Sequence, residues 1–103
     1  HGPWLKGRQH LLPLLEQHQV DLVISGHNHC YEHFLVNGIH HVVSGGGGAP
    51  LYGFDDGPPE EQALLVTQHK DFHFVRVDME PEQITLTTIL AETGEVVDTW
   101  TIP

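Results

Sequence analysis

Apolar residues recur at helical spacing through the first part of the chain. Leucines fall on one face between Trp4 and Gln19, which predicts a helix there. Pro13 interrupts this stretch, because proline inside a helix removes a backbone donor and crowds the preceding turn. The pattern therefore fits either a helix that starts near Leu12, with proline in its first turn, or a kinked helix that starts near Lys6.

The next stretch has a different pattern. Val20 to Ser25 is a nearly continuous apolar run, which is typical of a strand covered on both faces in a parallel sheet. A helix that leads directly into such a strand makes an α/β unit. In sheets of this kind ligands gather just beyond the carboxyl ends of the strands, so the residues after Ser25 are the first candidates for chemistry.

Most of the remaining chain alternates apolar with polar residues, which is the period of strands with one exposed face. Tyr31 to Val36 and Ile39 to Ser44 flank Asn37-Gly38, a strong signal for an antiparallel hairpin. Three later strands with short turns between them predict an antiparallel meander: Phe72 to Asp78, Gln83 to Leu90 and Glu95 to Ile102. The apolar residues from Ala63 to Thr67 are too few to assign.

Two stretches between the predicted strands read as turns or loops. Consecutive backbone N–H groups from Gly45 to Gly48 could in principle cradle an anion, but the run lacks the Gly-Lys-Ser/Thr ending of a phosphate-binding loop. A tight turn packed beneath the active face is the favoured interpretation. Residues 53–62 are acidic and contain Gly and Pro, which predicts an exposed loop; its Asp55-Asp56 pair supplies too few oxygens for a calcium site.

Gly26, His27 and His29 follow the first predicted strand directly. Glycine lets the backbone turn sharply, and two neutral imidazoles one residue apart can point into one crevice, so the pair is a candidate for metal ligation. Two ligands fill at most half of a coordination shell, and 10 of the 103 residues are histidine. The alternative is therefore a solvated loop. His10 and His18 are expected to be solvated surface residues.

Charge changes the picture further. Four Lys and Arg residues stand against 14 Asp and Glu residues, for a formal net charge of -10. The chain has no basic stripe to bind a phosphate backbone, which argues against a nucleic-acid partner. The same negative charge would repel a phosphate ester, so phosphatase activity would require metal cations that reverse the local field.

The remaining composition sets broad limits. A chain of 103 residues is one domain or part of one. No run approaches the ~20 apolar residues of a membrane span, and no signal-peptide pattern opens the chain. The single cysteine, Cys30, cannot form an internal disulfide and is expected to be a small buried residue. Because the sequence starts at His1 without methionine, we expect it to be part of something longer.

Gly26-His27-Asn28-His29 resembles the Gly-His-x-His box, the last metal-binding motif of the calcineurin-like metallophosphoesterases. The likeness continues through Cys30-Tyr31-Glu32-His33 and the glycine run that leads into Ala49-Pro50-Leu51-Tyr52, and it looks most like the purple-acid-phosphatase-like branch. The resemblance implies an α/β fold, namely the C-terminal half of a four-layer α-β-β-α sandwich with mixed inner strands and an antiparallel C-terminal meander. Residues 1–103 would then be a partial domain that lacks the N-terminal metal-ligand motifs.

The resemblance also implies a chemistry. Intact members hold two divalent or trivalent metal ions that activate water for attack on a phosphate ester. Carried over to this chain, it assigns His29 to the metal that also holds the family's Asp-x-His pair, and His27 to the other metal. Asn28 and Tyr31 are candidates to line the active site. The residues do not distinguish Fe, Zn and Mn or mono- from diesterase activity, and they leave the compartment unknown, although the family suggests an exported or periplasmic protein.

The chain departs from the family pattern at several positions. His33 stands where the family usually has an arginine, and a neutral imidazole cannot supply a permanent charge. The bridging Asp and the Gly-Asn-His motif have no counterpart here. Asp71-Phe72-His73 has the letters of the opening Asp-x-His motif, but it follows the Gly-His-x-His box, so we interpret it as a surface pair.

We therefore expect the parent protein to be a metal-dependent phosphoesterase with acid-phosphatase-like activity on a phosphate ester substrate. The 103-residue chain alone is expected to be inactive and to need the upstream half of the same domain as its partner. A parent that keeps the fold but has lost turnover fits the same residues. The alternative is a non-catalytic, mostly β interaction module with incidental histidines, and metal binding that depends on His27 and His29 separates the two.

Overall fold

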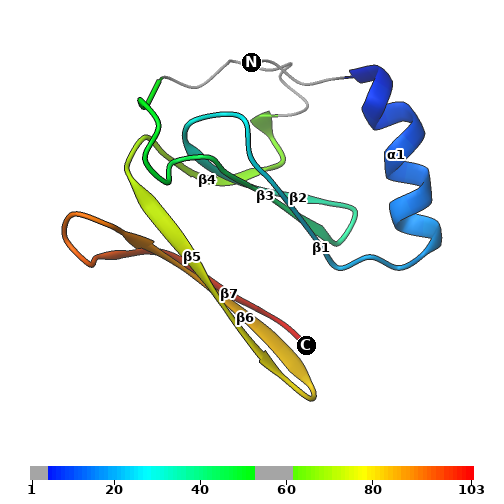
Figure 1. Cartoon of the computed structure of the whole chain (residues 1–103). Coiled ribbons are helices and arrows are strands. Elements are labelled where there is room, and N and C mark those ends of the chain that lie inside the picture. Colours follow the sequence, from blue (N-terminus) through cyan, green and yellow to red (C-terminus); the bar gives the residue numbers. More distant parts are fainter. Residues whose placement is uncertain (1–4, 53–61) are drawn as a thin grey trace.

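Two β-sheets and one helix make up the part of the chain that this computed structural model describes, residues 5–52 and 62–103 (Figure 1). The elements are α1 (Leu5–Gln17), β1 (Leu22–Ser25), β2 (Tyr31–Val36), β3 (Ile39–Ser44), β4 (Leu65–His69), β5 (His73–Glu80), β6 (Gln83–Leu90) and β7 (Val96–Ile102). The predicted acidic loop lies outside the described residues except for Gln62. No described helix is long and apolar enough to cross a membrane.

The first sheet has the strand order β1-β3-β2-β4. β1 runs parallel to β3, whereas β2 runs antiparallel to both β3 and β4. The hairpin between β2 and β3 turns at Asn37 and Gly38, whose φ angles of 51° and 79° are both positive, as a two-residue hairpin turn requires. The predicted hairpin and the helix-to-parallel-strand unit are thus confirmed.

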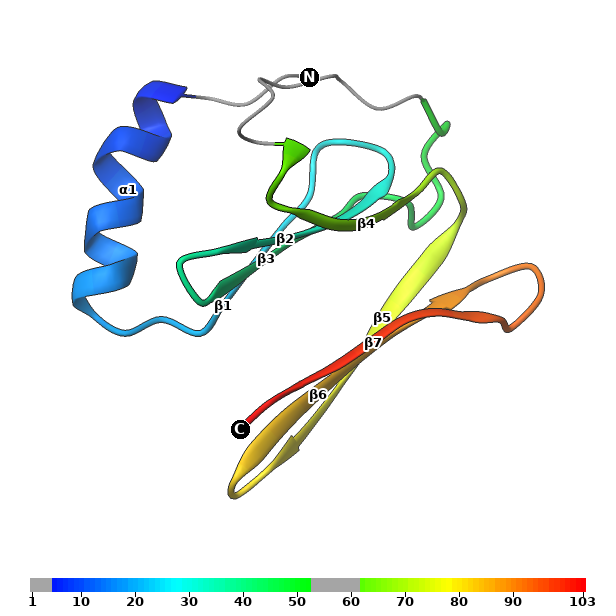
Figure 2. The same cartoon turned by 180° about the vertical axis from the view of Figure 1, so that it is seen from behind.

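The second sheet is the predicted antiparallel meander β5-β6-β7. Figure 2 shows it from behind, inclined to the first sheet. Tyr31 and His33 of β2 contact Asp98 and Trp100 of β7, so the two sheets face each other at this point. Mixed strands in one sheet and a meander in the other confirm the predicted α/β fold class.

β1 is less covered than its apolar sequence predicts. Ile24 is 52% exposed, and Ser25 is exposed as well. Among the described strands β1 lies at the edge of its sheet and pairs only with β3. Val42 of β3 is 1% exposed, so the covered part of this sheet lies inward of β1. The prediction of a strand covered on both faces is therefore wrong for these residues, because coverage depends on neighbours that the strand's own sequence does not specify.

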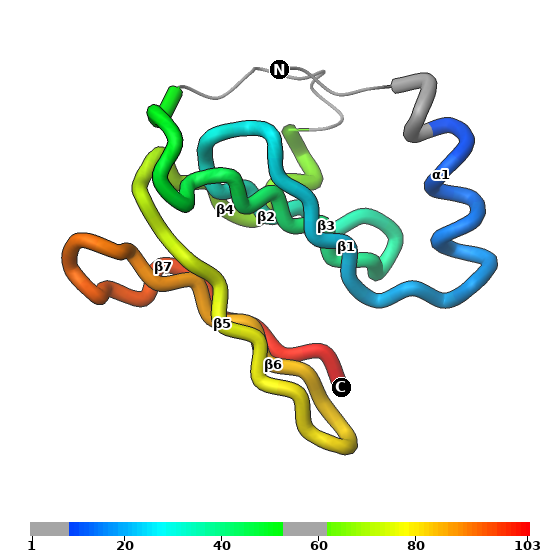
Figure 3. The backbone as a smooth tube through the Cα atoms, in the orientation of Figure 1, coloured from blue at the N-terminus to red at the C-terminus, as the bar shows by residue number. Residues whose placement is uncertain are grey.

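α1 begins at Leu5 and contains Pro13, so the longer of the two predicted helices is the observed one. The tube in Figure 3 places it beside the first sheet. The side chains of Leu11 and Leu14 each stay 51% exposed. His10 and His18 are exposed, as predicted. The helix therefore covers the sheet only in part.

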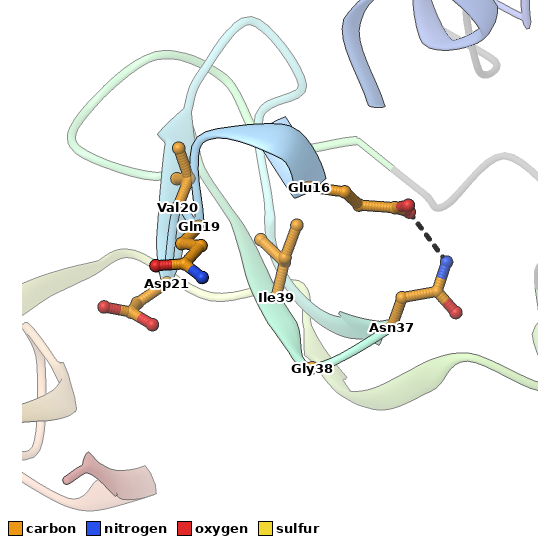
Figure 4. A pocket seen from close by; sticks show the side chains of 7 residues that line it. All are labelled: Glu16, Gln19, Val20, Asp21, Asn37, Gly38 and Ile39. Carbon is orange, nitrogen blue, oxygen red and sulfur yellow. Dashed lines mark hydrogen bonds between the residues drawn. The ribbon is translucent and has the colours of Figure 1, made fainter. Parts of the chain in front are cut away.

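A hollow of about 340 Å³ lies between the end of α1, the start of β1 and the hairpin turn (Figure 4). Glu16 and Asn37 face each other across it, and the Asn37 amide donates a hydrogen bond of 2.8 Å to the Glu16 carboxylate. Val20 and Asp21, which precede β1, line it as well. The hollow is therefore at the opposite end of β1 from His27 and does not belong to the predicted metal site.

The glycine run after β3 is a turn packed against the loop that follows β1. Gly45 N–H donates to the Cys30 carbonyl at 3.0 Å. A Cβ atom on Gly45 would lie 1.9 Å from the Asn28 carbonyl oxygen, and one on Gly46 would lie 2.6 Å from His73 Nδ1. A side chain at Gly45 would clash with the Asn28 carbonyl, and one at Gly46 would clash with the His73 ring. The close approach therefore requires glycine at both positions.

We expect Gly45→Ala to lower the free energy of unfolding by roughly 1–3 kcal/mol, because the methyl group overpacks a backbone contact. Gly47→Ala is the matched control, since a Cβ on Gly47 meets nothing within 4 Å. Its effect should stay within about 0.5 kcal/mol. Equilibrium urea unfolding of both variants measures the difference, and equal stability of the two would contradict the close contact.

Candidate metal centre

His27, Asn28 and His29 lie in the loop that leaves the carboxyl end of β1, where the sequence predicts them. The loop turns sharply, and Cys30 N–H donates to the Asn28 carbonyl at 2.8 Å. His27 is exposed and has a φ of 77°, in the left-handed region. A non-glycine residue there is strained by about 1–3 kcal/mol and persists only where its surroundings hold it.

The segment that follows the glycine turn holds this loop. His29 Nδ1 lies 2.8 Å from the Pro50 carbonyl oxygen. A carbonyl only accepts, so Nδ1 carries the proton and the neutral ring keeps its lone pair on Nε2. The Tyr52 hydroxyl donates to the His27 carbonyl at 2.9 Å, and its ring lies 4.6 Å from the His29 ring, centroid to centroid.

The contact of His29 with Pro50 is of a kind that metal-binding histidines make. Histidines that bind metal usually donate their other ring N–H to a carbonyl or carboxylate, which fixes the tautomer, and His29 has this arrangement. Within residues 5–52 and 62–103, no three His, Cys, Asp or Glu side chains are grouped so that they could hold a metal ion. A shared crevice for the rings of His27 and His29, with Asn28 lining it, stays a prediction.

Tyr31, the other candidate to line the site, is 0% exposed. Its hydroxyl donates to Asp98 Oδ2 at 2.7 Å, so the side chain lies between the two sheets. Burial raises the pKa of the Tyr31 hydroxyl well above its usual range, and the Asp98 carboxylate adds to the rise. Tyr31 therefore stays protonated and acts as a donor.

Asp98 is the centre of a polar cluster between the sheets. The same Oδ2 atom lies 2.8 Å from His33 Nδ1, and His33 Nε2 lies 2.9 Å from His40 Nδ1. The Trp100 ring stacks on His40 at 4.1 Å and on His33 at 4.5 Å, centroid to centroid. Of these side chains His33 is 2% exposed and Asp98 12% exposed.

The hydrogen-bond geometry limits the charge of the two histidines. A carboxylate only accepts, so His33 Nδ1 carries a proton toward Asp98. One hydrogen then lies between His33 Nε2 and His40 Nδ1, since protonating both rings would place two N–H groups 2.9 Å apart. The pair therefore holds at most one positive charge in this arrangement, and its protonation is a property of the pair.

The electrostatics of the cluster follow from burial and from these bonds. Burial alone would raise the pKa of Asp98, but hydrogen bonds from His33 and Tyr31, with the charges of His33 and His69, lower it below its usual value. Burial lowers the pKa of His40, and the charge of His33 lowers it further, while Asp98 and Asp21 oppose this shift.

His73 corrects one prediction. Asp71-Phe72-His73 was expected to form a surface pair, but His73 is 4% exposed and packs edge-on against the Tyr31 ring at 5.2 Å. Its Nδ1 donates to the Asp71 carbonyl at 2.9 Å, and its Nε2 accepts from the Ser44 hydroxyl at 2.8 Å. β5 begins next to the glycine turn, where His73 N–H donates to the Gly46 carbonyl at 3.0 Å. His73 therefore lies on the face of the second sheet that meets Tyr31.

Comparison with known proteins shows a likeness to purple acid phosphatases. Purple acid phosphatase 3 of Arabidopsis thaliana is 40% identical over 57 residues, and purple acid phosphatase 7 of the same plant is 41% identical over 52 residues. The structure of purple acid phosphatase PPD1 from yellow lupin (Lupinus luteus) seeds matches 93% of the chain with a TM-score of 0.78 and 30% identity. The chain is purple-acid-phosphatase-like. No protein-family model matches it.

The likeness covers a small part of each relative. The two Arabidopsis matches cover 53% and 50% of this chain but 16% of each plant protein. The lupin match covers 20% of that enzyme. The predicted resemblance to the C-terminal part of a purple-acid-phosphatase-like metallophosphoesterase is confirmed.

Two further structures resemble this purple-acid-phosphatase-like chain. GAP50, described as the anchor in the inner membrane complex of Plasmodium, matches with a TM-score of 0.76 and 26% identity over 91% of this chain and 29% of GAP50. Vps29 from Entamoeba histolytica matches with a TM-score of 0.53 over 92% of this chain and 46% of Vps29. At 19% identity, Vps29 shares the fold alone.

Sequence reasoning missed the residues that hold the loop and those that tie the sheets together. Tyr52 belongs to the stretch that carries the family resemblance, but no motif assigns it a contact with His27 and His29. Asp98 is 65 positions from His33, and nothing in an alternating strand marks its partner. The alternation of β7 places Asp98 on the inward-facing side of the strand, and this is the one sign in the sequence that Asp98 is buried.

We expect the Asp98 carboxylate to stabilise the purple-acid-phosphatase-like fold in a pH-dependent way. Because its folded-state pKa is lowered from the usual value, the folded chain binds fewer protons at this site than the unfolded chain. The stabilisation is therefore present above the usual pKa and is lost as the pH falls through the lowered one. Asp98→Asn keeps an acceptor oxygen without the charge, so its deficit in unfolding free energy should be constant down to about pH 4 and shrink below it.

Urea unfolding at several pH values measures this deficit. Asp78→Asn is the control, because Asp78 forms an exposed ion pair with Arg76 at 2.8 Å. Such pairs contribute about 0–1 kcal/mol, so little change is expected at any pH. A deficit of Asp98→Asn that stays constant down to about pH 3 would contradict the lowered pKa.

Proposed function

We propose that this chain contributes the Gly26-His27-Asn28-His29 loop to the dinuclear metal centre of a phosphoesterase, and that residues 1–103 form part of one such domain. His29 would bind one metal ion and His27 the other. The observation that carries the proposal is the bond between His29 Nδ1 and the Pro50 carbonyl, which leaves Nε2 available for a ligand. The likeness to the plant phosphatases supports the same assignment.

The charge of the chain favours the same conclusion. A formal charge of -10 repels a phosphate ester unless cations are bound. When bound, two metal ions in such a centre supply an activated water and neutralise charge on the phosphoryl oxygens. The role of this chain is to aim two imidazole nitrogens from a loop at the end of β1 and to keep that loop in one conformation.

The proposed site is incomplete in the described residues. Among them, no three His, Cys, Asp or Glu side chains are grouped so that they could hold a metal ion. The other ligands, including a carboxylate between the two metals, would come from the rest of the parent protein. The natural substrate would be a phosphate ester, and the isolated chain would be inactive.

A second candidate is a non-catalytic interaction module. The fold likeness to GAP50, whose described role is that of an anchor, favours it. In that case His27 and His29 would be incidental, and the polar layer between the sheets would serve stability alone. Metal binding that depends on both histidines separates the two candidates, because an anchor has no need of it.

We expect zinc or manganese to bind the 103-residue chain weakly, since two ligands leave most of the shell to water. His27→Ala and His29→Ala should each weaken binding further, by about tenfold. His18→Ala is the control, because His18 is exposed in the turn after α1. Isothermal calorimetry measures the zinc or manganese affinity of the unchanged chain and of each variant. Unchanged affinity in a His27→Ala, His29→Ala double variant would assign the binding to other histidines.

We also expect no hydrolysis of p-nitrophenyl phosphate by residues 1–103 above the rate of free manganese or zinc. The reason is that a two-metal centre requires enough fixed ligands to place both ions about 3.5–4 Å apart. Activity should appear once the upstream half of the domain is restored, and His27→Ala in that longer protein should abolish it. Turnover by the isolated chain that disappears in His27→Ala would reveal a complete site within these residues.

A further inference from the structure

Residues 50–52 return to the His27–His29 loop and contact it at three points. The Pro50 carbonyl accepts from His29 Nδ1 at 2.8 Å. The Tyr52 ring lies against the His29 ring at 4.6 Å with an angle of 36° between their planes. The Tyr52 hydroxyl donates to the His27 carbonyl at 2.9 Å. A single side chain, Tyr52, therefore touches both histidines.

The contact to His27 matters because that residue is strained. Its φ of 77° is in a region that a histidine occupies only when the surroundings hold it. The Tyr52 hydroxyl fixes the His27 carbonyl, and with it the plane of the peptide between His27 and Asn28. The Gly45 backbone packs against the next peptide, since a Cβ there would lie 1.9 Å from the Asn28 oxygen. Two consecutive peptides of the loop are thus restrained.

We propose that Tyr52 is a positioning residue for His27 and His29. Its hydroxyl holds the His27 backbone in the left-handed conformation, and its ring orients the His29 imidazole so that Nδ1 meets the Pro50 carbonyl. The consequence for metal binding rests on the proposed function, whereas the restraint of the loop is measurable without metal. In this proposal Tyr52 acts through His27 and His29 and is not itself a ligand.

Two variants separate the hydroxyl from the ring. Tyr52→Phe keeps the ring against His29 but releases the His27 carbonyl, and we expect zinc to bind about tenfold more weakly. Tyr52→Leu removes both contacts, and the loss should be larger than in Tyr52→Phe but no larger than in the His27→Ala, His29→Ala double variant. In a chain that carries His27→Ala and His29→Ala, Tyr52→Phe should not change the residual zinc affinity, because the two effects act through the same site.

NMR of the metal-free chain gives a readout that a general loss of stability would not produce. In Tyr52→Phe the three-bond HN–Hα coupling of His27 should move away from its left-handed value, while the ¹⁵N shifts of His29 keep the pattern of a protonated Nδ1. In Tyr52→Leu both signals should change. Thr85→Val is the control: it removes a hydroxyl bonded to Thr101 on β7, and it should leave both signals and the zinc affinity unchanged.

The outcomes decide the proposal without depending on the metal. An unchanged His27 coupling in Tyr52→Phe overturns the positioning role, and so does zinc affinity that falls equally in Tyr52→Phe and Thr85→Val. If the wild-type chain binds no zinc through His27 and His29, the proposed function fails, and the NMR signals still decide whether Tyr52 holds the loop. Loss of the left-handed signal with weakened zinc binding supports both.

Discussion

The structure depends on a close approach between backbones at two consecutive glycines. Gly45 packs against the Asn28 peptide of the loop after β1, and Gly46 packs against the ring and backbone of the segment that starts β5. At this point the loop, the first sheet and the second sheet meet, and neither glycine places a side chain between them. Because β1 and β3 are parallel, their carboxyl ends lie at the same edge of the sheet, so the turn after β3 necessarily reaches the loop after β1. The parallel pairing of β1 with β3 brings the turn after β3 next to the loop after β1. The glycines in that turn allow the two backbones to touch.

Polar rather than aliphatic side chains join the two sheets behind that junction. Tyr31 and His33 are two residues apart on β2, hence on one face, and both donate to a single oxygen of Asp98. A buried charge costs free energy unless it is paired and hydrogen-bonded, and this one has two donors. Shifting β2 by one residue would turn both donors to the opposite face. The cluster therefore favours one alignment of β2 with β7.

Local elements were predictable because their signals are local. Asn37-Gly38 marks the hairpin through its own backbone preferences, and the strands of the meander alternate within themselves. Burial was less predictable, because it depends on neighbours. The apolar run of β1 indicates a covered strand, yet Ile24 is half-exposed, and His73 is buried although its motif suggested the surface. For the site, sequence predicted His27 and His29, but contacts across 21 to 25 positions, such as those of Pro50 and Tyr52, leave no period to detect.

The proposed metal loop divides its requirements between two sources. Its geometry is set within this chain: strain at His27, a carbonyl on His29 Nδ1 and the Tyr52 side chain all belong to residues 27–52. The positive charge of the centre does not come from this chain, whose formal charge is -10. The described residues also contain no grouped set of three ligands. Preorganised ligands lose little conformational entropy when a metal binds. A loop that is already in shape therefore improves metal binding by a few neutral ligands. A loop built this way can keep its shape before the rest of a centre is present, which is the property that an incomplete site needs most.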